Sequence, residues 1–303
     1  GRKNFQHFNT QEPTHYIILS GDQLYRMDLR KMFEHHLERD AEVTLASTPV
    51  DRDRASNLGI IEADETLRVR NFHEKPGPET DIESLALPET IRTKLTDPNK
   101  RFLGSMGMYI FRSDILNHVL DNSYPDFAKE IIPQAIADHN VHTYVFDDYW
   151  VDIGTISSYY DTHLDLASQN PSFNFYDENM PIYTHRKHLP ATKIINCSMY
   201  NSLAAEGSFI RESSILNSVI GIRTKIESGA ILDGVVCLGA DYYETPEQIE
   251  QNKRRGVPNL GIGGGTVIKR AIIDTNARIG KNCLVGAEDG KRIEGQYDDH
   301  RSE

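Results

Sequence analysis

Acidic residues follow two of the strands that the sequence predicts. Asp22 comes three residues after the apolar run 15–19, and Asp152 lies in the segment 149–155 that follows the predicted strand 142–146. Each aspartate precedes a predicted helix, so both can face the crevice outside the carboxyl ends of the strands, where open α/β sheets bind ligands. Two carboxylates there suit Mg²⁺, which binds one or two carboxylates together with phosphate oxygens of a substrate. The alternative for residues 20–28 is an ordinary strand-to-helix turn with Asp28 as the N-cap.

A second candidate is the pair Glu74–Lys75, which stands at the end of the predicted strand 67–72, next to Pro76. A lysine in such a position can hold a phosphate, and a neighbouring glutamate can accept hydrogen bonds from sugar hydroxyls. Glu-Lys dipeptides are also common on solvated surfaces. The residues alone leave both interpretations open.

The elements that must position these residues alternate between strands and helices. Strand 15–19, helix 28–38 and strand 42–49 form a βαβ unit, which predicts a mostly parallel sheet. The sequence predicts a hairpin from 58–61 and 67–72 around a turn at 63–66. It further predicts strands at 105–111 and 142–146, and helices after Ser113, from 126–133 and after Thr155.

Bulk composition narrows the function classes. The chain has 303 residues, 38% of them hydrophobic, which is enough for two packed domains. A formal net charge of −12 argues against a nucleic-acid partner, which needs a basic surface. No apolar run approaches the ~18 residues of a membrane span, so we expect no membrane partner. The three cysteines form no CxxC pair, which is typical of reduced thiols in a cytoplasmic protein.

A six-residue repeat dominates the second half of the chain. Its apolar positions are Leu203, Phe209, Ile215, Ile220, Ile226, Leu232, Leu238, Val267, Ile273, Ile279 and Val285. This period fits neither a helix nor an alternating strand, and it is the hexapeptide signature of a parallel β-helix. The interruption at about 240–262 predicts a loop outside the coils. The glycine-rich run 261–265 lies in that context and not between a strand and a helix, so it does not predict a nucleotide site.

These patterns divide the chain into four parts. Residues 1–167 are the first domain, and 168–195, rich in Ser, Asn, Pro and Tyr, are a linker. Residues 196–290 are the β-helix, and 291–303 are a polar tail.

The sequence resembles the glucose-1-phosphate adenylyltransferases, also called ADP-glucose pyrophosphorylases. The matching segments include SGDQLYRMD (20–28), FHEKP (72–76), SMGMYIF (105–111), DFAKEIIP (126–133), YWVDIGT (149–155) and GADYYE (239–244). The resemblance runs from about residue 13 to 290. It implies an α/β fold, with a Rossmann-like nucleotidyltransferase domain followed by a left-handed parallel β-helix of hexapeptide repeats.

The resemblance also implies an activity, in which ATP and glucose 1-phosphate give ADP-glucose and diphosphate, in glycogen or starch synthesis. Asp22 and Asp152 match the aspartates that hold Mg²⁺, and Lys75 would hold the attacking phosphate. The matches to the glucose 1-phosphate contacts are Gly59, Glu74, Lys75 and Ser105. Members of the family are allosteric and bind small phosphorylated effectors, and the full-length protein is expected to be a homotetramer. Residues that could contact such effectors are Lys187, Lys269, Arg270 and Arg278, with an ordinary solvated surface as the alternative.

The chain departs from the family's pattern at its beginning. The family's glycine-rich loop of the GGGxGTRLxPLT type, which cradles nucleotide phosphates, has no counterpart in this sequence. We therefore expect a fragment of the enzyme whose chain as given lacks ATP binding and activity. The alternative is a non-catalytic regulatory or assembly subunit of the same family. A β-helix acyltransferase is disfavoured, because residues 196–290 contain no histidine to serve as its base.

Overall fold

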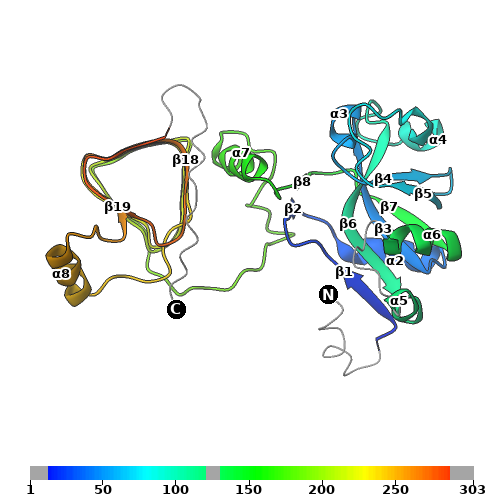
Figure 1. The fold of residues 1–303 in the computed structure, drawn as a ribbon, viewed down its shortest axis with the longest axis horizontal. Coiled ribbons are helices and arrows are strands. Elements are labelled where there is room, and N and C mark those ends of the chain that lie inside the picture. Colours follow the sequence, from blue (N-terminus) through cyan, green and yellow to red (C-terminus); the bar gives the residue numbers. More distant parts are fainter. Residues whose placement is uncertain (1–12, 121–129, 287–303) are drawn as a thin grey trace. The chain divides into compact units, whose positions relative to one another are not determined.

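The computed structural model describes residues 13–120 and 130–286. The start of the helix predicted at 126–133 and the polar tail 291–303 lie outside these residues. Contacts within the chain divide it into two compact units, residues 1–152 and 153–303 (Figure 1). Each unit has a core of its own.

The first unit is built on a six-stranded mixed sheet. Its strands are β1 (His15–Ile18), β3 (Val43–Val50), β4 (Ile60–Ala63), β5 (Val69–His73), β6 (Phe102–Arg112) and β7 (Val141–Val145). The order is β5-β4-β6-β3-β7, and β1 pairs with β6. Among these pairs, β3 and β7 are parallel and the others are antiparallel. The prediction of a mostly parallel sheet is wrong, because β6 runs antiparallel between β1 and β3. Those two strands still share one direction, as the βαβ unit requires.

Short helices cover this sheet, and a separate two-stranded ribbon joins its edge. The helices are α2 (Leu29–Glu38), α3 (Arg52–Ala55), α4 (Glu89–Arg92), α5 (Ser113–Leu120), α6 (Ile132–Asp138) and the 3₁₀ turn η1 (Glu83–Leu85). The ribbon pairs β2 (Gln23–Tyr25) with β8 (Trp150–Asp152). The predicted helix 28–38 is confirmed, and the Asp28 carboxylate caps it by accepting the N–H of Arg30 at 3.0 Å.

The core of the first unit lies on both sides of β3 and β6. Phe111 and Leu45 are fully buried on one side, and Met32 of α2 packs with Met106 and Met108 on the other. The apolar run 15–19 predicts a wholly buried strand; the strand forms, but Ile17 stays 44% exposed. Leu19, two residues further on the same side of the chain, is also 44% exposed, so this face keeps solvent contact.

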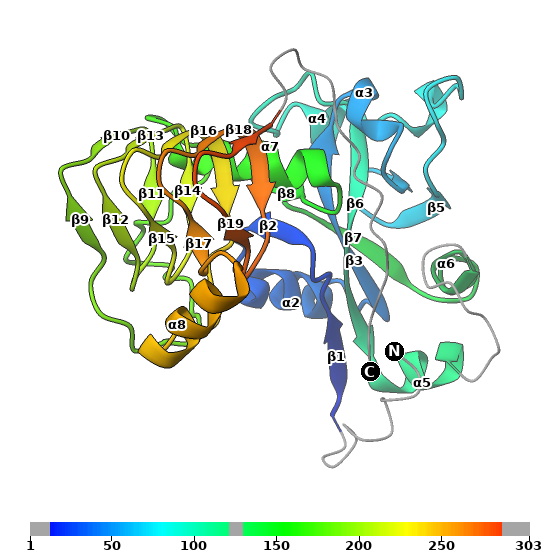
Figure 2. The ribbon, with the colours of Figure 1, turned by 60° about the vertical axis from the view of Figure 1, so that its left-hand side comes forward.

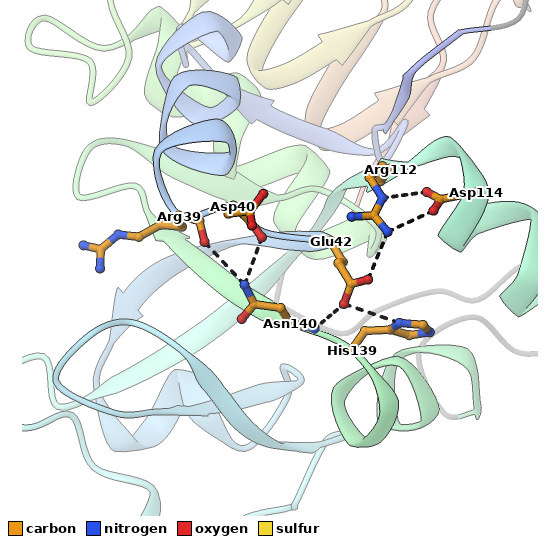
Figure 3. A network of polar contacts seen from close by, with 7 residues as sticks. All are labelled: Arg39, Asp40, Glu42, Arg112, Asp114, His139 and Asn140. Carbon is orange, nitrogen blue, oxygen red and sulfur yellow. Dashed lines mark hydrogen bonds and ion pairs between the residues drawn. The ribbon is translucent and has the colours of Figure 1, made fainter.

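A polar network ties together the ends of three strands (Figure 3). The carboxylate of Glu42, just before β3, accepts the Arg112 guanidinium at 3.1 Å and the backbone N–H of Asn140 at 2.7 Å. Arg112 also donates to Asp114 at the start of α5, and His139 lies 3.5 Å from the Glu42 carboxylate. Glu42 therefore fixes the beginnings of β3 and β7 against the end of β6.

The second unit is a parallel β-helix, and Figure 1 looks along its axis so that the coils superpose as a triangle. Its strands are β9 (Lys193–Ile195), β10 (Ser198–Tyr200), β11 (Leu203–Ala204), β12 (Phe209–Arg211), β13 (Ser214–Leu216), β14 (Val219–Ile220), β15 (Lys225–Ile226), β16 (Ile231–Cys237), β17 (Gly261–Ile262), β18 (Val267–Ile273), β19 (Arg278–Ile279) and β20 (Leu284–Val285). All their pairs are parallel. The predicted hexapeptide architecture is confirmed.

The interior column of the β-helix differs in phase from the predicted one at three positions. Ile215, Ile220 and Ile226 are fully buried as predicted. At three of the other eight positions the neighbouring residue takes the interior place: Ile210 for Phe209, Cys237 for Leu238, and Ile268 for Val267. Leu203 also lies outside the buried cluster, whereas Leu232 and Ile273 belong to it and Ile279 and Val285 pack against it. Phe209 instead stands outside, with the cations of Lys193 and Arg211 over its ring at 5.7 and 5.2 Å. The reason is that either residue of an apolar pair keeps the six-residue spacing, and only stacking between coils selects one.

The predicted loop at about 240–262 contains the helix α8 (Pro246–Arg255), which stands outside the coils (Figure 2). Glu244 anchors this loop, and its side chain is only 6% exposed. It accepts hydrogen bonds from Asn252 at 2.6 Å, the Leu260 N–H at 2.8 Å and Arg278 at 2.6 Å. Burial opposes ionisation of Glu244, but these donors outweigh it and hold its pKa below the ordinary value.

The helix α7 (Ile156–Ala167) lies at the end of the predicted first domain, 1–167, and makes its contacts with the β-helix. The Tyr160 hydroxyl donates to the carbonyl of Gly234 at 2.7 Å, and α7 packs against β14 and β16. The described helices include none that is long and apolar enough to cross a bilayer.

Candidate functional site

The site predicted from the sequence surrounds a gap along one edge of β6. On the side of β6 away from β3, β1 pairs with residues 109–112 and β4 with Leu103 and Gly104. Between these stretches, neither strand pairs with residues 105–108. The chain leaves β1 through Leu19 and enters β4 after Gly59, so both connections open at this gap. A split between neighbouring strands is where α/β sheets bind ligands.

Three residues predicted to contact glucose 1-phosphate are neighbours across strands at this gap. The carbonyl of Gly59 accepts the N–H of Ser105 at 2.7 Å. On its other side, a methyl group at Gly59 would lie 3.0 Å from Glu74 Oε2 and would clash with the ring of Phe72. Gly59 therefore needs to be glycine for close packing, and it brings Glu74 and Ser105 to the two sides of one residue.

A bulge in β6 shapes the same edge. The register between β3 and β6 shifts between Leu45 and Ser47, opposite residues 105–109 of β6. Gly107 adopts φ +65°, which glycine tolerates at no steric cost, and its N–H donates to Ser105 Oγ at 3.2 Å. The bulge thus holds the Ser105 hydroxyl at the gap.

Lys75 is exposed and has an unusual backbone conformation. Its φ is +44°, which costs a non-glycine residue roughly 1–2 kcal/mol and therefore has to be held by surrounding structure. That support is present: the N–H of Gly77 donates to the Ser56 carbonyl at 3.2 Å, and Arg52 donates to the carbonyls of Pro78 and Thr80 at 2.9 and 2.6 Å. The loop that carries Lys75 is therefore tied to the segment just before Gly59.

The ribbon of β2 and β8 brings Asp22 and Asp152 close along the backbone. Gln23 pairs with Asp152, so Asp22 is one residue out of register with it. Both aspartates are exposed, and Asp22 accepts the Ser20 hydroxyl at 2.7 Å. The register places Gln23 directly across from Asp152. Asp22 lies in the bend just before the strand.

The donor set at the ribbon fits Mg²⁺ better than a transition metal. The described part of the chain holds no group of three or more His, Cys, Asp or Glu that could bind a metal by itself. Two exposed carboxylates leave most of the coordination to water and to phosphate oxygens, which is the way Mg²⁺ is bound in phosphate-transfer sites. Asp22 and Asp152 are the residues that would hold it.

The structure adds residues that sequence reasoning missed, chiefly Gln23 and Trp150. Gln23 Nε2 donates to the Met106 carbonyl at 2.6 Å, and Trp150 Nε1 donates to Gln23 Oε1 at 2.9 Å. The guanidinium of Arg54 lies over the Trp150 ring at 5.9 Å. Gln23 directly follows Asp22 but belongs to no motif with a characteristic spacing. Only its hydrogen bonds to residues far along the chain reveal its role.

The four predicted effector contacts lie in three separate places of the second unit. Lys187 is in the exposed linker, and Lys269 and Arg270 are exposed on β18 beside Asp233 and Gly234 of β16. Arg278 belongs to the other sheet, where it donates to Glu244 and to the Pro258 carbonyl at 2.8 Å. Lys269 and Arg270, which are adjacent in the sequence, therefore lie on a different sheet from Arg278.

Family models match both parts of the chain. The nucleotidyl transferase model matches residues 2–169, more than half of the chain, and a model described as the GLGC left-handed parallel beta-helix domain matches residues 187–301. The chain belongs to the nucleotidyl transferase family. The order of the two domains is that of the ADP-glucose pyrophosphorylase architecture, as the sequence resemblance predicts.

Proposed function

We propose that this chain carries the glucose 1-phosphate half of a glucose-1-phosphate adenylyltransferase site. The reaction joins ATP and glucose 1-phosphate to ADP-glucose and diphosphate. A phosphate oxygen of the sugar phosphate attacks the α-phosphorus of ATP, and the bond from that phosphorus to the β-phosphate oxygen breaks, so that diphosphate leaves with the electron pair.

One observation carries the proposal: Gly59, Glu74 and Ser105 meet at the gap along β6, beside the ribbon that bears Asp22 and Asp152. Carboxylates, a lysine and a close-packed glycine are the groups that a sugar phosphate needs around it. The family match supports the reaction class, and the adenylyl and glucosyl specificity are part of the proposal.

Each residue has a role that follows from its chemistry. Glu74 accepts hydrogen bonds from sugar hydroxyls, and the missing side chain at Gly59 lets Phe72 and Glu74 pack against its backbone, which keeps Glu74 beside Ser105. Lys75 pairs with the phosphate and orients its attacking oxygen, which is most of what a protein contributes to phosphoryl transfer. When bound by Asp22 and Asp152, Mg²⁺ would neutralise the charge of the phosphates.

The proposal includes the wider setting that the resemblance implies. The full-length protein would be a cytoplasmic homotetramer in glycogen or starch synthesis, regulated by small phosphorylated effectors. Lys269 and Arg270, which lie side by side on β18, are the better placed of the candidate effector contacts.

The test is calorimetric titration of the purified chain with glucose 1-phosphate, glucose 6-phosphate and inorganic phosphate, followed by an ADP-glucose assay with ATP and Mg²⁺. We expect glucose 1-phosphate to bind best and Lys75→Ala to weaken it about tenfold or more, since a charge-assisted contact contributes about 1.5–3 kcal/mol. Lys31→Ala, an exposed lysine on α2, should leave the affinity unchanged.

The outcomes separate the alternatives. Specific binding together with ADP-glucose formation supports the enzyme. Specific binding without synthesis supports the non-catalytic subunit or the fragment. Equal affinity for the three phosphates contradicts the proposal.

A further inference from the structure

Gln23 lies between the two halves of the candidate site and contacts both. Its side chain donates to the Met106 carbonyl of β6, one residue after Ser105, at 2.6 Å. It accepts the indole N–H of Trp150, two residues before Asp152, at 2.9 Å. Its own backbone follows Asp22 and pairs with Asp152. One side chain thus joins the strand of the sugar-phosphate contacts to the ribbon of the aspartates.

The position of this contact has a physical cause. Met106 is fully buried and lies in the bulged stretch of β6 that neither β1 nor β4 pairs with. A buried carbonyl without a partner costs about 1–3 kcal/mol, and Gln23 supplies the donor that a strand would otherwise provide. This stretch of β6 also lies close to Gln23 and Ser20, since a methyl group at Gly107 would be in van der Waals contact with Gln23 Nε2 at 3.6 Å and with Ser20 Cβ at 3.7 Å.

The two side-chain hydrogen bonds of Gln23, to Met106 and to Trp150, form a clamp between β6 and the ribbon. The bond with the Trp150 indole fixes its ribbon end. Trp150 is only 4% exposed, so its N–H also needs a partner inside the protein. Because Gln23 uses its amide N–H for Met106 and its amide oxygen for Trp150, rotation of the amide would break both bonds. The side chain therefore has one satisfied orientation, which sets the distance between β6 and the ribbon.

We propose that Gln23 is a positioning residue that holds the Asp22/Asp152 ribbon against the Ser105 edge of β6, so that metal and sugar phosphate bind in one coupled site. This inference rests on the proposed function, because the ligands are those of that reaction. In this proposal Gln23 acts through the two elements that it joins and not through contact with either ligand. A cation on the ribbon attracts a phosphate at the β6 edge more strongly the closer the two are held, so coupling between the two ligands measures the clamp.

The experiment measures glucose 1-phosphate affinity of the full chain by calorimetry, with and without saturating Mn²⁺, and counts bound Mn²⁺ by electron paramagnetic resonance. For the wild type we expect Mn²⁺ to strengthen glucose 1-phosphate binding about tenfold. Gln23→Leu removes both hydrogen bonds and keeps a side chain of similar size. In this variant we expect each ligand still to bind, and the effect of Mn²⁺ on glucose 1-phosphate affinity to fall below about twofold. Gln251→Leu, a change of the same kind at an exposed position on α8, should behave as the wild type does.

Folding is checked with the same samples, because Trp150 is the chain's single tryptophan and its emission reports its burial alone. If Gln23→Leu shows the emission of an unfolded chain, Trp150→Phe replaces it, since this change removes the indole donor and leaves the bond to Met106. Folding of this variant, which has no tryptophan, is followed by far-ultraviolet circular dichroism. In Trp150→Phe we expect Mn²⁺ to strengthen glucose 1-phosphate binding by less than in the wild type and by more than in Gln23→Leu.

A purely structural role would lower the melting temperature and leave the coupling at its wild-type value. Wild-type coupling in a folded Gln23→Leu or Trp150→Phe variant therefore overturns the inference while the proposed function stands. A wild-type chain that binds both ligands without coupling also overturns it. A wild-type chain that binds neither ligand contradicts the proposed function, and this inference fails with it.

Discussion

The two units of this protein join residues at very different distances along the chain. In the first unit, Gln23 bonds to Met106 and Trp150, which lie 83 and 127 residues away. In the β-helix, Asn217 bonds to Asp233 and the Thr224 N–H to Ser208, each 16 residues away on the neighbouring coil. A substitution in the β-helix therefore disturbs adjacent coils, whereas one at the gap along β6 disturbs a site assembled from several distant segments.

The units also bury different polar groups. The β-helix buries uncharged hydroxyls, at Ser208, Ser218, Thr224 and Thr266. The first unit buries hydroxyls as well, at Thr44, Ser47, Thr48 and Thr143, but in addition it buries His36 and His142, which can take up a proton. Stability of the first unit should therefore depend on pH in mildly acidic solution, and that of the coils should depend far less on it.

The largest expected effect is on chemistry, at the ribbon. In a protein that makes ADP-glucose, Asp152→Asn should abolish synthesis, with a loss of about a thousandfold or more in kcat, because a metal ligand contributes several kcal/mol to the transition state. The side chain is exposed, so the melting temperature should stay the same. Asp138→Asn at the exposed end of α6 is the control. Turnover at the wild-type rate in Asp152→Asn would contradict the assignment of Asp152 as a metal ligand.

The next effect is on the β-helix alone. Ile226 is fully buried in the interior column, and truncation to alanine should lower the free energy of unfolding by about 2–5 kcal/mol. Ile231→Ala, at a position 42% exposed in the next turn of the chain, should cost far less. Calorimetry of the two variants measures this difference. Because Ile226 and the gap along β6 belong to different units, glucose 1-phosphate affinity of the folded Ile226→Ala protein should be unchanged, and a loss of affinity would contradict the local character of the coils.

The third prediction concerns the buried histidine of α2. Burial, and then the nearby His15 and His35, lower the pKa of His36 to about 4. The unfolded chain binds a proton near pH 6.5 and the folded chain does not, so stability should fall as the pH drops from about 6.5 and should level off near pH 4. The loss is about 3 kcal/mol.

His36→Gln keeps a hydrogen-bonding group toward Thr44, which lies 2.8 Å from His36 Nδ1, and cannot take up a proton. Denaturant titrations at pH 7 and pH 4.5 should therefore show a smaller loss in this variant. His185→Gln in the exposed linker is the control. An equal loss of stability in the wild type and His36→Gln would contradict the assignment to His36.

The smallest effect should be at the loop of α8. Glu244→Gln removes the ion pair with Arg278 and should loosen the loop by about 1–2 kcal/mol, seen as faster hydrogen exchange of the α8 amides. Because the pKa of Glu244 is lowered in the folded chain, its stabilisation is present above the ordinary pKa of 4.5 and is lost as the pH falls through the folded value.

Glu250→Gln, which breaks an exposed pair with Arg254 at 3.4 Å, is the matched control and should have almost no effect. Equal exchange rates in the two variants would show that Glu244 does not anchor the loop.

Local patterns predicted a large part of this fold. The six-residue repeat predicted the β-helix and the position of its insertion, because each coil repeats the same environment. The sequence predicted the helix 28–38 with Asp28 as a possible N-cap, which corresponds to α2, and the turn at 63–66 predicted the hairpin of β4 and β5. Each of these signals depends on residues a few positions apart.

The sequence by itself determined the classes of element, the repeat and the family resemblance, since all three are properties of local order along the chain. Only the tertiary structure decided that β6 lies between β1 and β3, that Ile210 and not Phe209 enters the column, and that Gln23 connects the two halves of the site. These choices depend on pairing between segments that are far apart in sequence. Their partners are selected by packing and by the need of buried carbonyl and N–H groups for a hydrogen bond, which no spacing within a segment records.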